Sequence, residues 1–131
     1  MPVRLLIVDD DETHRRSLAE AFDRPGYEVS NLPDGRQAVE RVRREDVDVV
    51  LLDVLMPGLN GLETLVQIRE LRPLTEVIFL TGHADVQTAV EAIAKGAFDY
   101  VAKPVDLPEL MGKVEAACAN RQFQQRLAAA E

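Results

Sequence analysis

Residues 3–11 read VRLLIVDDD, an apolar run of strand length that ends in three consecutive acids. Residues 49–53, VVLLD, repeat this arrangement further along the chain. The segments LLIV and VVLL are continuously apolar, whereas a strand with one solvated face would alternate apolar and polar residues. We therefore predict two central strands of a parallel sheet, each with acidic side chains at its carboxyl end.

Three further apolar runs complete a set of five predicted strands: Val3–Val8, Tyr27–Asn31, Val47–Leu52, Glu76–Leu80 and Phe98–Ala102. The segments between them carry apolar residues at helical spacing. Because strand and helix alternate five times, we predict an α/β fold with a five-stranded parallel sheet, doubly wound as (βα)5. By analogy with such folds we expect the flavodoxin-like strand order 2-1-3-4-5, with ligands bound beyond the carboxyl ends of the strands.

Capping residues indicate where the helices begin. An N-cap acceptor three residues before a Glu or Gln occurs three times, as Asp34 with Gln37, Asn60 with Glu63 and Asp106 with Glu109. Asp85 is expected to cap another helix, which Lys95-Gly96 would end. A first helix is predicted from about Glu12 to Arg24, where Pro25-Gly26 would end it.

Composition restricts the classes of function. A chain of 131 residues fits one domain, and a formal net charge of −8 disfavours direct binding to nucleic acid, which depends on clustered Lys and Arg. Cys118 is the only cysteine, so a disulfide within the chain and a cysteine zinc cluster are excluded, and we expect a reducing cytoplasm. No apolar stretch approaches the roughly 20 residues that cross a bilayer, so we expect no membrane partner.

Polar side chains lie at or just beyond the carboxyl ends of four predicted strands: Asp9 and Asp10, Asp53, Thr81, and Lys103. The first and third strands would be neighbours, so their three carboxylates should meet in a small volume. Like charges this close raise pKa values or require a cation, and carboxylate oxygens with room for water suit Mg²⁺. We therefore predict a magnesium site, whereas Asp11 and Glu12 can be explained as helix caps.

The same residues suit phosphoryl transfer. Asp53 can be the nucleophile, because carboxylates are established covalent acceptors of phosphoryl groups. Such a transfer needs mainly positioning and neutralisation of charge. Asp9 and Asp10 would hold the metal, while Lys103 would supply an ammonium group and Thr81 a hydroxyl donor to the phosphoryl oxygens.

This ordered set of motifs resembles the bacterial response-regulator receiver family over about Val3 to Ala119. The matching stretches are LIVDDD at residues 6–11, LLDVLMPG at 51–58, Asn60-Gly61, LTGH at 80–83, and GAFDY at 96–100 running to Lys103-Pro104. The sequence around Thr81 and Tyr100 is most similar to that of receivers of nitrogen-regulation-type transcriptional regulators.

The resemblance implies a signalling switch of a two-component system and not an enzyme in the usual sense. A sensor histidine kinase would supply the phosphoryl group to Asp53, and autodephosphorylation would remove it. Asp10 would ligate Mg²⁺ directly and Asp9 mainly through water. Asp53 and the backbone carbonyl of Leu55 would complete the protein's share of the metal shell.

The resemblance also implies how the switch would work. Thr81 and Lys103 would bind the phosphoryl oxygens, and Tyr100 would change rotamer as Thr81 moves. The surface formed by helix four, strand five and helix five would then change, which would control a homodimer or a transcriptional, DNA-binding output domain outside this chain. The peptide bond Lys103-Pro104 is expected to be cis.

Two further expectations concern residues near the site and the end of the chain. Leu55 and His83, each two residues after a site residue, should tune hydrolysis of the acyl phosphate. Residues 1–120 would form the receiver domain, and residues 121–131, with Phe123 and Leu127 on one face, a helical extension or linker toward a possible output domain.

Three other readings remain open at this point. The spacing Asp9-x-Asp11-x-Thr13 after an apolar strand also imitates the nucleophile motif of haloacid dehalogenase-like Mg²⁺-dependent phosphatases. In that class Asp53 would have no role. The class also carries a motif of paired acidic residues late in its sequence, and no such motif follows Lys103. A receiver-like module that acts without phosphorylation is another alternative, and a flavin-binding flavodoxin is disfavoured because acids replace its phosphate loop.

Overall fold

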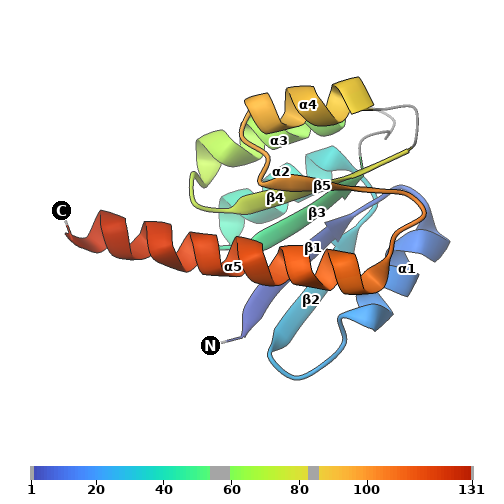
Figure 1. Ribbon diagram of the computed structural model, residues 1–131, viewed down its shortest axis with the longest axis horizontal. Helices are drawn as coiled ribbons and strands as arrows, with labels where there is room; N and C mark the ends of the chain where they lie inside the picture. Colours follow the sequence, from blue (N-terminus) through green and yellow to red (C-terminus); the bar gives the residue numbers. More distant parts are fainter. Residues whose placement is uncertain (1, 54–59, 83–85, 131) are drawn as a thin grey trace.

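A single parallel sheet lies between two layers of helices in the computed structural model, which describes residues 2–53, 60–82 and 86–130 (Figure 1). Its strands are β1 (Val3–Val8), β2 (Tyr27–Leu32), β3 (Val49–Asp53), β4 (Glu76–Thr81) and β5 (Asp99–Ala102). The helices are α1 (Glu12–Ala21), α2 (Gly35–Arg44), α3 (Gly61–Leu71), α4 (Val86–Ala94) and α5 (Leu107–Ala130). All strand pairs are parallel, in the order β2-β1-β3-β4-β5. The predicted fold and strand order are confirmed.

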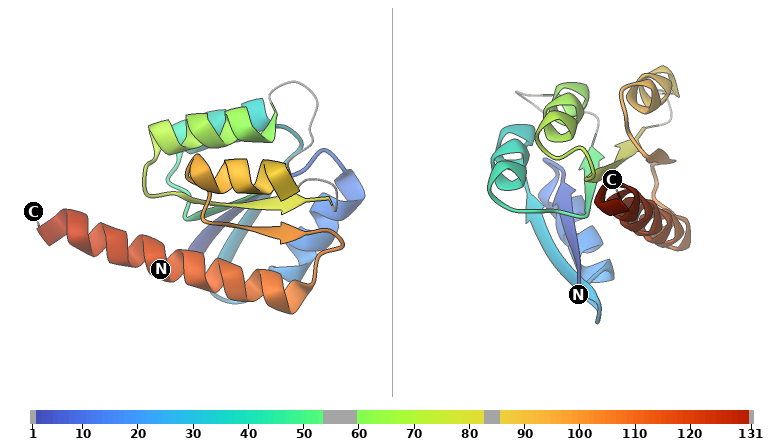
Figure 2. Two further views of the ribbon diagram at one scale, coloured as in Figure 1. Left: turned by 45° about the horizontal axis from the view of Figure 1, so that its top comes forward. Right: turned by 90° about the vertical axis from the view of Figure 1, so that its left-hand side faces the viewer.

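The central strands are buried on both faces, which explains their unbroken apolar sequence. Leu6, Val8 and Leu52 point into a core shared with α2, α3 and α4. Leu5 and Leu51 point into a second core on the opposite face, beneath α1 and α5. Figure 2 shows the two helical layers on either side of the sheet.

The predicted caps Asp34 and Asn60 are confirmed, but the end of one helix differs from the prediction. Asp34 accepts a hydrogen bond from the Gln37 N–H, and Asn60 accepts one from the Glu63 N–H, each at 2.9 Å. The predicted end of α1 at Arg24 is wrong, because the helix stops at Ala21. The fully buried Phe22 still donates its N–H to the Leu18 carbonyl at 3.2 Å, whereas the Asp23 N–H donates to the Glu20 carbonyl, three residues back, at 3.1 Å, and the α-helical pattern ends there.

Helix α5 is anchored at the end of the sheet where the strands begin. The buried side chains of α5 are those of Leu110, Val114, Ala117 and Arg121. Arg121 is 4% exposed; its Nε donates to Asp48 Oδ1 at 2.9 Å and its Nη2 to Asp46 Oδ2 at 2.7 Å. Beyond this anchor α5 continues past the sheet (Figure 1), and Phe123 and Leu127 are exposed.

Within the described part of the chain, no helix combines the length and the apolar composition required to cross a membrane.

Candidate functional site

The carboxyl ends of β1 and β3 bring three carboxylates together. Val8 on β1 pairs with Leu52 on β3 in the sheet. The residues that follow them, Asp9 and Asp53, therefore lie side by side. One carboxylate oxygen from each of Asp9, Asp10 and Asp53 lies within 4.8 Å of the other two. Asp9 and Asp53 are buried and Asp10 is exposed. The group therefore opens to solvent on the side of Asp10.

Lys103 reaches this acidic group from the segment after β5. Its Nζ lies 3.2 Å from Asp53 Oδ2 and 4.0 Å from Asp9 Oδ2. The Lys103 N–H donates to the carbonyl of Thr81 at 2.6 Å, which ties this segment to the end of β4. The peptide bond between Lys103 and Pro104 is cis, as expected. The ammonium group of Lys103 thus faces two carboxylates.

Thr81 and Tyr100 lie on the neighbouring strands. Thr81 is the last residue of β4 and is buried, next to the β3 strand that carries Asp53. Tyr100 on β5 is 37% exposed, and the Nζ of Lys113 lies 5.5 Å from the centre of its ring. The same Lys113 Nζ donates to the backbone carbonyl of Tyr100 at 2.6 Å. In this structure the ring therefore lies at the surface, against α5.

Residues at the start of α1 also take part in the site, which sequence reasoning missed. The Asp11 N–H donates to Asp9 Oδ1 at 2.9 Å, and Nδ1 of His14 lies 2.5 Å from Asp9 Oδ2. Nη1 of Arg15 donates to the backbone carbonyl of Asp9 at 2.9 Å. A signal was available, because a helix capped by Asp11 places His14 in its first turn, directly above the preceding strand end.

The electrostatic environment separates the two buried carboxylates. Burial raises the pKa of Asp53, and the neighbouring carboxylate of Asp9 raises it further, against an opposing effect of Lys103. Burial also disfavours ionisation of Asp9, but hydrogen bonds from His14 and the Asp11 N–H, together with Lys103, hold the pKa of Asp9 below its usual value. Asp9 is therefore the more stable anion, and ionised Asp53 is the group that would benefit most from a cation.

The raised pKa of Asp53 predicts the effect of removing its charge. A raised folded-state pKa favours folding at pH values below the unfolded-state pKa, and this contribution is lost as the pH rises through the folded-state pKa. At neutral pH, Asp53→Asn should therefore raise the free energy of unfolding by about 1 kcal/mol in metal-free buffer. Urea unfolding at neutral and at acidic pH measures this gain, which should disappear in acid.

Asp34→Asn is the matched control for this prediction. It makes the same change of charge at a helix cap, where Asp and Asn are equally favourable. The free energy of unfolding of this variant should stay near that of the parent. A loss of stability in Asp53→Asn at neutral pH would contradict the prediction.

Leu55, His83 and the predicted cap Asp85 lie outside the described residues. Asp11 is the N-cap of α1, where its side chain accepts from the His14 N–H at 3.2 Å. This contact explains Asp11 as a helix cap. The haloacid dehalogenase-like interpretation needs Asp11 as the second acid of its motif, and the contact supplies no catalytic function for it.

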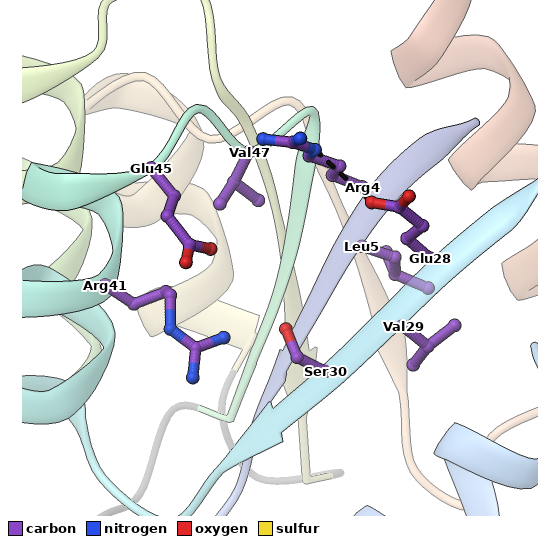
Figure 3. Close-up of a pocket in the computed structure, with 8 residues that line it drawn as sticks. All are labelled: Arg4, Leu5, Glu28, Val29, Ser30, Arg41, Glu45 and Val47. Atoms are coloured by element: carbon purple, nitrogen blue, oxygen red, sulfur yellow. Dashed lines mark ion pairs between the residues drawn. The ribbon is translucent and has the colours of Figure 1, made fainter. Parts of the chain in front are cut away.

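A hollow of about 470 Å³ lies at the opposite end of β1 and β2, away from the acidic group (Figure 3). Its lining includes Arg4 and Glu28, which form an ion pair at 3.4 Å, and Arg41 and Glu45 from α2. The lining charges therefore balance in number. The candidate site is the open acidic group and not this hollow.

The chain is similar in sequence to a known protein family and to several known proteins. The family described as Response regulator receiver domain matches residues 5–115. The regulatory protein AtoC of Escherichia coli is 46% identical over 107 residues, which are 82% of this chain and 23% of AtoC. The DNA-binding transcriptional regulator NtrC of the same species is 38% identical over 120 residues, 92% of this chain and 26% of NtrC.

A solved structure shows the same architecture. The crystal structure of NtrX from Brucella abortus in complex with ADP matches with a TM-score of 0.93 at 28% identity. The match covers 100% of this chain and 30% of that chain. The chain thus spans about a quarter of the length of the two regulators named above, and a comparable part of NtrX.

Proposed function

The chain belongs to the response-regulator receiver family, and from this membership we propose that it is a phosphorylation-dependent switch whose acceptor is Asp53. The observation that carries the proposal is the juxtaposition of three carboxylates within 4.8 Å with the Lys103 ammonium group, 3.2 Å from Asp53. This arrangement combines a nucleophile, ligands for a cation and a counter-charge for a phosphoryl group.

The donor set of this acidic group fits Mg²⁺, which receiver domains bind at this position. All three side chains offer oxygen, and solvent can reach the group beside Asp10, in agreement with the preference of Mg²⁺ for carboxylates and retained waters. We assign direct ligation to Asp10 and Asp53, a water-mediated contact to Asp9, and a backbone ligand to Leu55. When bound, the ion would neutralise charge on the acceptor and on the phosphoryl oxygens.

The chain's own residues account for the transfer step. An oxygen of Asp53 attacks the phosphorus atom of a phosphohistidine on the sensor kinase; the P–O bond forms as the P–N bond breaks, and the imidazole leaves with the electron pair. Lys103 offsets the negative charge of the transferred group, and the Thr81 hydroxyl donates to one of its oxygens. Water later cleaves the acyl phosphate, with Leu55 and His83 as the residues that tune this hydrolysis.

The signal would leave through the surface formed by α4, β5 and α5. Phosphorylation adds about −1.5 to −2 charge, which draws Thr81 and Lys103 toward Asp53 and opens space for the ring of Tyr100. We propose that this change controls a homodimer or a DNA-binding output domain outside this chain, in the cytoplasm. Residues 1–120 would then be the receiver and residues 121–131 the connection.

Labelling with a small phosphodonor tests this function. The chain is incubated with phosphoramidate and Mg²⁺, and intact mass spectrometry measures the added phosphoryl group. The parent should gain one group only when Mg²⁺ is present, and Asp53→Asn none. Asp9→Asn should keep its acceptor and label slowly, whereas a haloacid dehalogenase-like phosphatase would lose its nucleophile with Asp9 and keep it in Asp53→Asn.

A further inference from the structure

The carboxylate of Asp9 is held from several directions. It is 0% exposed, its Oδ1 accepts from the Asp11 N–H at 2.9 Å, and its Oδ2 lies 2.5 Å from Nδ1 of His14. The backbone carbonyl of Asp9 accepts from Arg15 Nη1 at 2.9 Å. Both carboxylate oxygens and the main chain of Asp9 are therefore restrained by residues at the start of α1.

His14 is well placed to act as a rigid support. It lies in the first turn of α1, and its own N–H is bonded to the cap Asp11 at 3.2 Å, which fixes its backbone. Its side chain is 27% exposed, so the imidazole packs against the site more than it faces water. Among the residues that the structure describes, the side chains that lie close enough together to hold a metal ion are those of Asp9, Asp10 and Asp53. His14 therefore contacts the ligand set through Asp9 and does not complete it.

Lys103 is the second neighbour of Asp9 Oδ2, and its position explains why a support for the Asp9 carboxylate would matter. Lys103 Nζ lies 4.0 Å from this oxygen and 3.2 Å from Asp53. Without His14, the carboxylate of Asp9 could turn toward the ammonium group and present less negative charge beside Asp10. A carboxylate oxygen has two lone pairs, so Oδ2 can accept from His14 and still face an ion or its bound water.

We propose that His14 is a positioning residue for the magnesium site, which it serves by donating from Nδ1 to Asp9 Oδ2 and fixing the orientation of this carboxylate. The inference rests on the proposed function, because it assumes that the acidic group holds Mg²⁺. It assigns a role to a side chain of α1 that neither the acidic motifs nor the phosphoryl-binding residues include. Outer partners of metal-ligating carboxylates commonly contribute in this way.

Calorimetric titration of Mg²⁺ into the parent chain and its variants tests the proposal. His14→Ala should weaken Mg²⁺ binding about tenfold. His14→Asn should restore affinity close to that of the parent, because the amide nitrogen of Asn and Nδ1 of His are both attached to Cγ. Ser17→Ala, an exposed position one turn further along α1, serves as the matched control and should leave the affinity unchanged.

A double-mutant cycle separates the hydrogen bond from general effects. In the Asp9→Asn background, His14→Ala should cause little further loss of affinity, because the partner of the imidazole has already changed. Urea unfolding of every variant checks that the folded fraction is the same during the titration.

Each outcome decides the proposal. Unchanged or tighter Mg²⁺ binding by His14→Ala would overturn it, as would an Asn variant as weak as the Ala variant, or full additivity with Asp9→Asn. Failure of the proposed function looks different: the parent itself would bind no Mg²⁺ or accept no phosphoryl group on Asp53. Parent binding that His14→Ala leaves unaltered would overturn the role of His14 alone.

Discussion

Substitution Lys103→Met is expected to slow both the formation and the hydrolysis of the phosphorylated form about 100-fold. The Lys103 ammonium group lies 3.2 Å from Asp53, where negative charge accumulates in both reactions. Methionine keeps much of the length and volume of the side chain but removes its charge, so the acceptor stays in place while the stabilising charge is lost.

Time-resolved intact mass spectrometry with phosphoramidate and Mg²⁺ gives both rate constants. Lys95→Met, which makes the same substitution at an exposed position after α4, is the control and should leave both rates near those of the parent. Rates within a few-fold of the parent for Lys103→Met would show that Lys103 is only a surface lysine close to Asp53.

The second large effect concerns stability. Leu51 on β3 is 0% exposed, and its side chain fills the core between the sheet and the layer formed by α1 and α5. Leu51→Ala should lower the free energy of unfolding by about 4 kcal/mol, because it removes buried methyl and methylene groups and leaves a cavity in a rigid core.

Urea unfolding followed by circular dichroism measures this loss. The same substitution at Leu127, which is 48% exposed on α5, is the control and should change the free energy of unfolding by less than about 0.5 kcal/mol. Equal losses at the two positions would mean that the core beneath α1 and α5 contributes much less to stability than its burial indicates.

The central strands were predictable because a strand that is buried on both faces has a continuously apolar sequence, and the strand order followed from the alternation of strands and helices. The run from Leu5 to Val8 is buried without interruption, as its composition predicted. The approach of Asp9 to Asp53 followed from the same pattern, since neighbouring parallel strands that end at the same level bring their next residues together. Caps such as Asn60 were predictable because they depend on contacts within four residues.

Features that depend on tertiary packing were not predictable in this way. The helix α1 ends at Ala21, just before Phe22, whose ring packs edge to face against Tyr27 with the ring centres 5.5 Å apart. His14 was missed although the Asp11 cap places it in the first turn of α1, because its bond to Asp9 also depends on the angle at which α1 leaves the sheet. The anchoring of Arg121 on Asp46 and Asp48 joins residues more than 70 positions apart.

This anchor has a mechanical consequence for α5. Arg121 acts as a pivot at the far end of the sheet, and residues 122–130 form a stiff lever about 13 Å long at a rise of about 1.5 Å per residue. A tilt of about 10° at the pivot would displace the tip of the lever by roughly 2 Å. Lys113, which contacts Tyr100, lies about 12 Å before this pivot, so a displacement of α5 there would reach Ala130 with similar size and opposite direction.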